Sequence, residues 1–221
     1  MDKINEFRDK LRLKNIKGLA LDIDETLADS NYAWFESMFK FHAPEDMDIE
    51  NVMKEYKFVE KVPGWDTKEA FDHIKMLTHS EEFNEAVPLM EDANHIVSKI
   101  DKIIPILVYL TARPQTVMGA TKRWLQKHSF PEAELITRSA DIKAGESDLI
   151  DRNKWKAEIL VNLYPYIQGI IDDNKTLTHE LHKLDYQGTL YLYGTDSEEF
   201  GNYKHVVICP TWSSVLDKIK S

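Results

Sequence analysis

The chain has 221 residues, 43% of them hydrophobic and 10% aromatic, which supports one sizeable core with a small insertion and argues against two large independent domains. Its formal net charge of −10 gives a surface that repels polyanions, so nucleic acid is not an expected partner. The single cysteine, Cys209, excludes an intramolecular disulfide. The charged N-terminus and the lack of any apolar stretch approaching roughly 20 residues predict a cytoplasmic protein without a membrane partner.

Apolar runs with strand character alternate with amphipathic segments along most of the chain. We expect strands at 18–23, 103–110, 133–137, 168–171, 189–193 and 205–209. Helical periodicity falls at 89–100, 116–127, 155–164, 177–184 and 212–219. This alternation predicts an α/β fold with a doubly wound parallel sheet.

The interval 31–86 interrupts the alternation. It contains helix-like pieces at 32–41, 49–58 and 68–77 and no convincing strand. We interpret it as a helical cap inserted after the first strand, with 1–30 and 87–221 forming the α/β core. The alternative is that these helices pack on one face of the sheet.

Two carboxylates follow the first strand. Asp22 and Asp24 are separated by one residue, so on extended backbone both side chains point to the same side. Two close anions repel unless a cation lies between them, which makes the pair a candidate ligand set for Mg²⁺. The alternative is a turn in which Asp24 or Thr26 caps free backbone amides.

Polar residues also follow the second and fourth strands. Thr111 and Arg113 can hold phosphate oxygens, although a threonine ahead of a helix is more often a cap. Asp172 and Asp173 can complete the coordination of the same Mg²⁺, or one of them can cap the next helix. We expect the lysines at 154 and 156 in the first turn of a helix. A lysine there opposes the helix dipole, and this unfavourable position makes sense if one of the two neutralises a bound phosphate.

These motifs, in this order, resemble those of the haloacid dehalogenase superfamily. The segment 22–27 is similar to its DxDxT-L signature, and Thr111, a lysine near 154–156 and the pair Asp172 and Asp173 match its other three motifs. The resemblance covers roughly residues 16–30 and 88–221. Within the superfamily, 111–173 is similar to the phosphatase half of polynucleotide kinase phosphatases, an alignment that favours Lys156 over Lys154. Those phosphatases lack a long helical insertion here, which puts a polynucleotide substrate in doubt.

The resemblance implies an Mg²⁺-dependent phosphatase with the metal at Asp22, the backbone carbonyl of Asp24, and Asp172 or Asp173. Asp22 then attacks phosphorus to form an aspartyl-phosphate, and Asp24 moves the protons. Thr111 and Lys156 hold the phosphate oxygens, and Arg113 contacts the phosphate or the leaving group.

Asp24 also indicates the type of reaction. Dehalogenases and phosphonatases of the family lack an aspartate at this position, so its presence favours a phosphate ester. We expect a small phosphorylated metabolite or nucleotide as substrate. The alternatives are a 3′-end phosphatase of nucleic acids and a non-catalytic binding protein.

Stacking on a nucleobase is one possible role for the aromatic residues of the interval, and packing is the commoner one. They are Tyr32, Trp34, Phe35, Phe39, Tyr56, Phe58, Trp65 and Phe71. The sequence does not indicate an oligomeric state.

Overall fold

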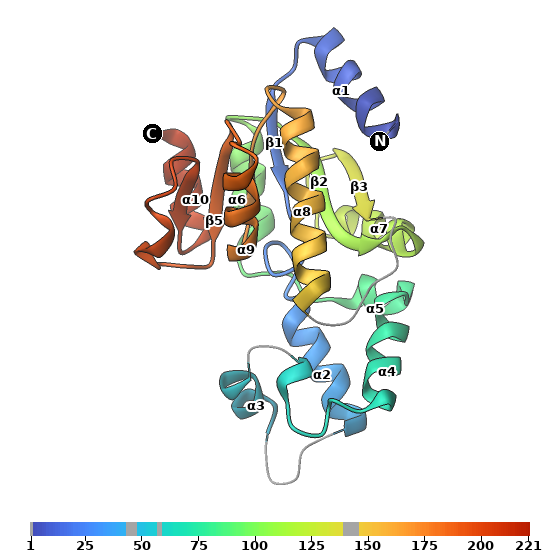
Figure 1. Ribbon diagram of the computed structural model, residues 1–221. Coiled ribbons are helices and arrows are strands. Elements are labelled where there is room, and N and C mark those ends of the chain that lie inside the picture. The colour runs from blue at the N-terminus through green and yellow to red at the C-terminus, as the bar shows by residue number, and fades with distance from the viewer. Residues whose placement is uncertain (1, 43–47, 57–58, 139–145) are drawn as a thin grey trace.

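The computed structural model describes residues 2–42, 48–56, 59–138 and 146–221, and these contain a six-stranded, fully parallel β-sheet (Figure 1). The strands are β1 (Gly18–Leu21), β2 (Ile106–Pro114), β3 (Glu134–Arg138), β4 (Ile167–Asp172), β5 (Thr189–Tyr193) and β6 (Val206–Cys209). Their order across the sheet is β3-β2-β1-β4-β5-β6. The predicted doubly wound parallel sheet is therefore confirmed. In this topology the chain reverses direction across the sheet beside β1, and ligands bind at the carboxyl ends of the strands at that point.

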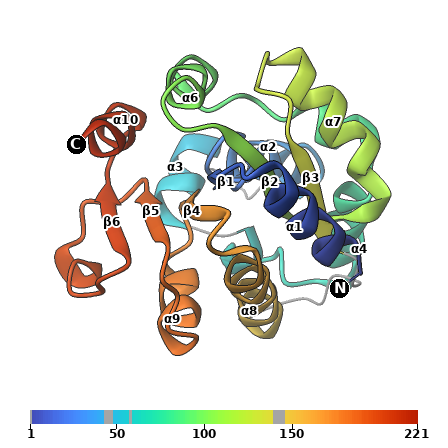
Figure 2. The ribbon, with the colours of Figure 1, turned by 90° about the horizontal axis from the view of Figure 1, so that it is seen from above.

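Helices cover both faces of the sheet (Figure 2). One face carries α6 (Ala93–Asp101), α7 (Met118–Lys127) and α10 (Trp212–Lys220), and the other carries α1 (Asp2–Lys14), α8 (Glu146–Leu163) and α9 (Lys175–Lys183). β1 is fully buried because alternate residues enter the two cores: Leu19 and Leu21 face the first set of helices and Ala20 faces the second.

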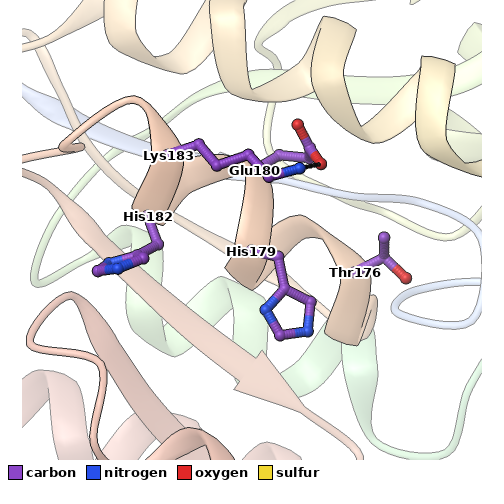
Figure 3. A pocket seen from close by; sticks show the side chains of 5 residues that line it. All are labelled: Thr176, His179, Glu180, His182 and Lys183. Atoms are coloured by element: carbon purple, nitrogen blue, oxygen red, sulfur yellow. Dashed lines mark hydrogen bonds and ion pairs between the residues drawn. The ribbon is translucent and has the colours of Figure 1, made fainter.

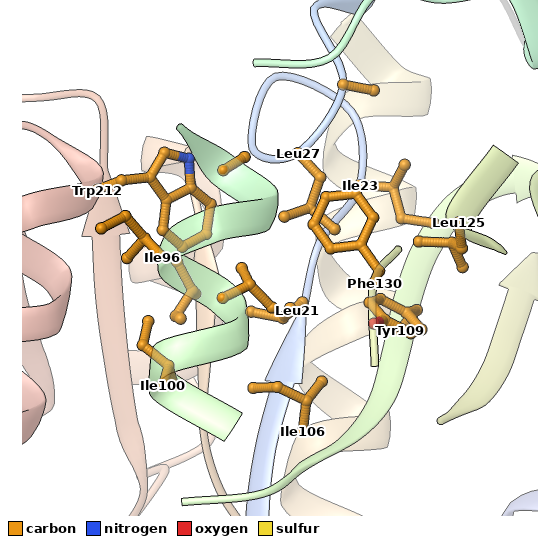
Figure 4. Close-up of a cluster of buried hydrophobic side chains, with 14 of the residues drawn as sticks. Leu21, Ile23, Leu27, Ile96, Ile100, Ile106, Tyr109, Leu125, Phe130 and Trp212 are labelled. Carbon is orange, nitrogen blue, oxygen red and sulfur yellow. The ribbon is translucent and has the colours of Figure 1, made fainter. Parts of the chain in front are cut away.

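The core under α6 and α10 fixes the start of the loop that follows β1. Figure 4 shows Ile23 and Leu27 from this loop in the same cluster as Leu21, Ile96 and Trp212. Ile23 and Leu27 are completely buried, and burying such a side chain contributes roughly 1.5–3 kcal/mol. The residues between them are therefore held by two apolar anchors.

The described part of the segment between β1 and α6 contains helices, turns and two isolated β-bridges but no strand. It forms α2 (Ser30–His42), α3 (Ile49–Glu55), the 3₁₀ turn η1 (Val59–Lys61), α4 (Lys68–Thr78) and α5 (Glu81–Ala86). Helices α2 to α4 lie beyond the carboxyl edge of the sheet (Figure 1) and share a separate hydrophobic cluster that includes Phe35, Met38 and Trp65. A division of the chain into a core and a cap at 31–86 stays a prediction.

Helix α5 packs against α7 of the core. Arg123 of α7 pairs with both Glu81 and Glu85 of α5, and the indole nitrogen of Trp124 donates a hydrogen bond to the carbonyl of Val87 at 2.8 Å. The helical segment is thus joined to the core through α5 as well as through the start of α2.

Several predicted boundaries differ from the observed ones. The second strand was expected at 103–110 but extends to Pro114, because Thr111 pairs with Thr137, and Pro114 with Arg138, in β3. Thr111 and Arg113 therefore lie in the strand rather than after it. The 3₁₀ turn η2 (Gln115–Val117) separates β2 from α7.

Two helices differ more strongly. Helix α8 begins at Glu146, so Lys154 and Lys156 lie beyond its first turn and the predicted opposition to the helix dipole is wrong. Helix α1 was not predicted, and only Phe7 and Leu11 of it are buried.

The predicted helix 49–58 ends at Glu55, and Phe58 lies outside the described residues. No helix in the described part of the chain is long and apolar enough to cross a bilayer.

Candidate active site

A tight turn after β1 presents Asp22 and Asp24 at the carboxyl edge of the sheet. The backbone amides of Leu27 and Ala28 both donate to the carbonyl of Ile23 at 2.8 Å, which closes the turn. Within this turn Glu25 adopts a left-handed backbone conformation, with φ at 59°. That conformation is costly for a residue with a side chain. Such strain persists only when the surrounding structure enforces it. Here the buried residues on either side of the turn do so.

Lys156 joins the first and fourth strands electrostatically. Its Nζ lies 2.7 Å from Oδ2 of Asp22 and 2.8 Å from Oδ2 of Asp172, and the three side chains are at most 7% exposed. The amide of Asp22 also donates to the carbonyl of Ile171 at 3.0 Å, which holds β1 beside β4. Lys154 is exposed, so of the two candidate lysines the structure brings Lys156 to the site.

Three carboxylates form a group that fits a divalent cation. One carboxylate oxygen each from Asp22, Asp172 and Asp173 lies within 4.8 Å of the other two. If all three are ionised, the single charge of Lys156 leaves two negative charges, which one divalent cation would balance. Carboxylate oxygens are the ligands that Mg²⁺ prefers. The side chain of Asp24 is not in this group, and metal binding by its backbone carbonyl stays a prediction.

Asp24 is held by three residues from two segments, β2 and the start of α2. Arg113 donates to it from Nη2 at 2.7 Å to Oδ1 and from Nε at 3.0 Å to Oδ1 and 3.2 Å to Oδ2. Ser30 donates to Oδ1, and Thr111 donates to Oδ2 at 3.4 Å. Thr111 and Arg113 thus contact Asp24 in this structure, and their predicted contacts with phosphate stay a prediction.

Arg113 is itself fixed by its surroundings. Its guanidinium carbon lies 5.9 Å from the centre of the Trp124 ring, and its backbone amide donates to Oγ1 of Thr111 at 3.1 Å. The side chain is 4% exposed, and its Nη1 atom has no hydrogen-bond partner among the described residues. The two ends of this ion pair are therefore held in place before any substrate binds.

The two aspartates of the turn have opposite pKa shifts. Burial raises the pKa of Asp22 well above 3.8, and the charges of Asp172, Asp173 and Asp24 add to this shift while Lys156 opposes it. Burial would also raise the pKa of Asp24, but the charge and hydrogen bonds of Arg113 outweigh it and lower that pKa.

Two further carboxyl groups beside the turn have raised pKa values. Burial, with a contribution from Asp172, raises the pKa of Asp173 to about 7. Burial also raises the pKa of Glu25 to about 7, against the hydrogen bond that it accepts from the backbone amide of Asn31. Negative charge is therefore concentrated in a poorly solvated region, as expected for a cation site.

A cavity of about 250 Å³ opens onto these groups. The described residues that line it are Asp22, Asp24, Glu25, Asn31, Ala112, Arg152, Asn153, Lys156, Asp173, Asn174, Lys175 and Thr176. Sequence reasoning missed Arg152 and Asn153, which precede Lys156 by four and three positions and so share its face of α8. That spacing was the signal that could have identified them.

A second hollow, of about 400 Å³, lies along α9 (Figure 3). Figure 3 shows Lys183 paired with Glu180, at 2.6 Å, and the rings of His179 and His182 directed away from that pair. The Nδ1 atom of His179 is 3.1 Å from the hydroxyl of Tyr203. This hollow has no pair of free carboxylates among its described residues, so the cavity at Asp22 is the better candidate active site.

No protein-family model matches the sequence, and no curated protein matches it. Solved structures do match the fold. A provisionally assigned phosphatase from Clostridium difficile has a TM-score of 0.57 at 16% identity and covers 92% of this chain and 99% of its own.

Two further structures extend over the same part of the chain. A HAD-superfamily hydrolase from Ehrlichia chaffeensis has a TM-score of 0.50 at 13% identity, with coverage of 93% and 98%. The L-2-haloacid dehalogenase from Xanthobacter autotrophicus, solved with chloropropionic acid covalently bound, has a TM-score of 0.52 at 13% identity, with coverage of 93% and 99%. Structural similarity at these identities establishes the fold alone. The chain has the haloacid dehalogenase fold, as its motifs indicated.

Proposed function

We propose that this chain is an Mg²⁺-dependent phosphomonoester hydrolase that forms an aspartyl-phosphate on Asp22. The observation that supports it most is the position of Asp22, which contacts Lys156 and forms one group with the carboxylates of Asp172 and Asp173. A second aspartate, Asp24, is held two residues later. Asp22, Asp172 and Asp173 would hold the metal, together with the backbone carbonyl of Asp24. When bound, Mg²⁺ would reduce the repulsion between Asp22 and the phosphate and stabilise charge on the transferring group.

The residues of the chain would perform the other steps. A carboxylate oxygen of Asp22 attacks phosphorus in line with the leaving oxygen, so one P–O bond forms as another breaks. Lys156 neutralises charge on the phosphate oxygens. Asp24 gives a proton to the leaving alkoxide, then takes one from the water that hydrolyses the aspartyl-phosphate. We also propose that α2 to α4 cover the site and select the substrate.

Asp24 argues for a phosphate ester over a haloacid. A halide ion is a stable leaving group and needs no proton, whereas an alkoxide does. The hydrogen bonds to Asp24 from Arg113, Ser30 and Thr111 hold that carboxylate at the site. Equal turnover of a 2-haloacid and a phosphate ester would contradict this preference.

Turnover of p-nitrophenyl phosphate, with and without Mg²⁺, tests the proposal. We expect hydrolysis that depends on Mg²⁺ and is abolished by a chelator. A 3′-phosphorylated oligonucleotide in the same assay tests the nucleic-acid alternative, which predicts that it is preferred over free nucleotides. A folded, metal-binding protein that is inactive on a broad panel of phosphate esters would instead support a non-catalytic binding role.

Replacing Arg113 with methionine should shift the pH profile of kcat/KM and leave the protein folded. Arg113 lowers the pKa of Asp24, so its removal should raise that pKa. The limb of the kcat/KM profile that requires protonated Asp24, the proton donor to the leaving oxygen, should then move to higher pH. Steady-state kinetics at a series of pH values would measure the shift. Arg123→Met is the control, because Arg123 pairs with Glu81 and Glu85 away from the site. A uniform loss at all pH values would contradict this role of Arg113.

Magnesium should stabilise the protein more at alkaline than at acidic pH. The pKa of Asp173 in the fold is about 7, above 3.8, so the metal-free fold binds this proton more tightly than the unfolded chain. Its contribution to stability is therefore present below about pH 4 and lost as pH rises through about 7. Mg²⁺ competes with that proton. At a concentration of 100 times Kd it should raise Tm by roughly 5–10 °C near pH 8 and less near pH 5.

Thermal melts with and without Mg²⁺ at the two pH values measure this difference. Asp173→Asn should reduce both the metal effect and its pH dependence. Equal stabilisation at both pH values would show that Asp173 does not compete with the metal for a proton.

A further inference from the structure

Asn153 is a buried polar residue beside the candidate active site. Its side chain is fully buried, and in the part of the chain that the structure describes neither Nδ2 nor Oδ1 has a hydrogen-bond partner. The neighbouring Arg152 has the same feature at Nε. Nearly all buried polar groups in native proteins are hydrogen-bonded, because leaving one unpaired costs free energy. A group from outside the chain is therefore expected to complete these hydrogen bonds.

Both residues border the same cavity as Asp22 and Lys156. They precede Lys156 on α8 by about one turn, roughly 5 Å along the helix axis. The first part of α8 lies at the carboxyl edge of the sheet, the edge beyond which α2 to α4 lie (Figure 1). When the phosphorus atom of the substrate lies at Asp22, a substrate group that contacts Asn153 belongs to the alcohol part, which leaves after phosphoryl transfer.

The cavity walls indicate what that leaving part is. Except for Ala112, every described residue that lines the cavity has a charged, amide or hydroxyl side chain, and no described aromatic residue is among them. Phe35 and Trp65, which were considered for stacking on a nucleobase, are buried in the hydrophobic cluster of α2 to α4. A volume of about 250 Å³ is also below the roughly 300–1,000 Å³ of sites for larger ligands.

We infer that Asn153, with Arg152 beside it, binds the hydroxyl groups of a small polyol or sugar monophosphate. The carboxamide offers one acceptor and two donor hydrogens, which match neighbouring hydroxyls that each donate and accept. The inference rests on the proposed function and selects a hydroxylated metabolite over a nucleotide as its substrate.

Kinetics of Asn153→Leu on two kinds of substrate test this inference. Leucine keeps the approximate volume of asparagine but cannot form hydrogen bonds. We expect kcat/KM for glycerol phosphate and hexose 6-phosphates to fall at least about tenfold more than kcat/KM for p-nitrophenyl phosphate, which has no hydroxyl groups on its leaving part. The thermal midpoint should stay the same or rise, because an unpaired buried polar group is removed. Asn162→Leu is the matched control, since Asn162 is on the same helix but outside the cavity lining.

A binding measurement separates this inference from the proposed function. Calorimetric titration of Asp22→Asn and of Asp22→Asn/Asn153→Leu with a hexose 6-phosphate requires no turnover. Selective loss of binding in the double variant supports the subsite even if the wild-type chain hydrolyses nothing, a result that would overturn the proposed function alone. Equal losses on all substrates, a wild-type preference for nucleoside monophosphates, or unchanged hexose phosphate binding in the double variant would overturn the inference.

Discussion

Asp22→Asn should abolish phosphatase turnover while leaving the protein folded. An amide oxygen is a poor nucleophile, so the covalent step is lost, and kcat should fall by at least about 1,000-fold. The substitution is nearly isosteric, and Lys156 keeps its contact with Asp172 at 2.8 Å. Turnover of p-nitrophenyl phosphate at saturating Mg²⁺ measures the effect, and trapping of labelled phosphate on the wild-type chain alone would identify the covalent intermediate.

The same variant should be more stable than the wild-type chain in the absence of metal. Because burial and the neighbouring carboxylates raise the pKa of Asp22, ionising it in the fold costs more than ionising it in the unfolded chain. That cost begins as pH rises above about 3.8 and is complete above the raised pKa. An amide avoids it, so Tm should rise at neutral pH. Asp29→Asn, outside the cavity lining, is the matched control. Residual turnover comparable to wild type would exclude Asp22 as the nucleophile.

The sequence predicted the sheet well because its strands are buried on both faces. Runs such as 103–110 are almost entirely apolar, and such runs are typical of parallel sheets covered by helices. Helix α1 was missed for the opposite reason, since nine of its 13 residues are polar or charged and the residues it buries in the core are Phe7 and Leu11. Its assignment requires knowledge of the surface that it covers.

The candidate site was only partly predictable. Its motifs are short segments of sequence, whereas its contacts join residues that are far apart in the sequence. Spacing in the sequence placed Asp22 and Asp24 on one side and Asp172 at the end of a neighbouring strand. The pairing of Arg113 with Asp24 joins residues 89 positions apart and depends on β2 continuing past its apolar run. Taken alone, the segment 111–114 is expected to follow the strand, with the side chains of Thr111 and Arg113 binding phosphate. In the fold both side chains donate hydrogen bonds to the half-buried carboxylate of Asp24.

The unpaired amide of Asn153 could not be predicted from sequence, because burial without a partner is a tertiary property. An asparagine near the start of a helix is ordinarily read as a cap or as a solvated residue. Only the longer course of α8, which begins at Glu146, places it one turn before Lys156 inside the helix.

Lys156→Met should cause the largest loss of stability and also abolish activity. Lys156 is 4% exposed and contacts two buried carboxylates, from Asp22 at 2.7 Å and Asp172 at 2.8 Å. Removing the cation leaves two buried negative charges together, and breaking a buried pair in this way costs about 3–5 kcal/mol. The same change removes the positive charge that would hold the phosphate. Denaturant titration and p-nitrophenyl phosphate kinetics measure the two effects.

Lys154→Met separates a specific role of Lys156 from a general effect of lost charge, because Lys154 is exposed on the same helix. It should change stability by less than about 0.5 kcal/mol and leave turnover intact. Adding Asp172→Asn to Lys156→Met removes one of the stranded charges and should recover part of the stability but none of the activity. Recovery of both would mean that Lys156 acts only as a counterion to the carboxylates. Loss of activity in Lys154→Met alone would instead assign the phosphate-binding role to Lys154.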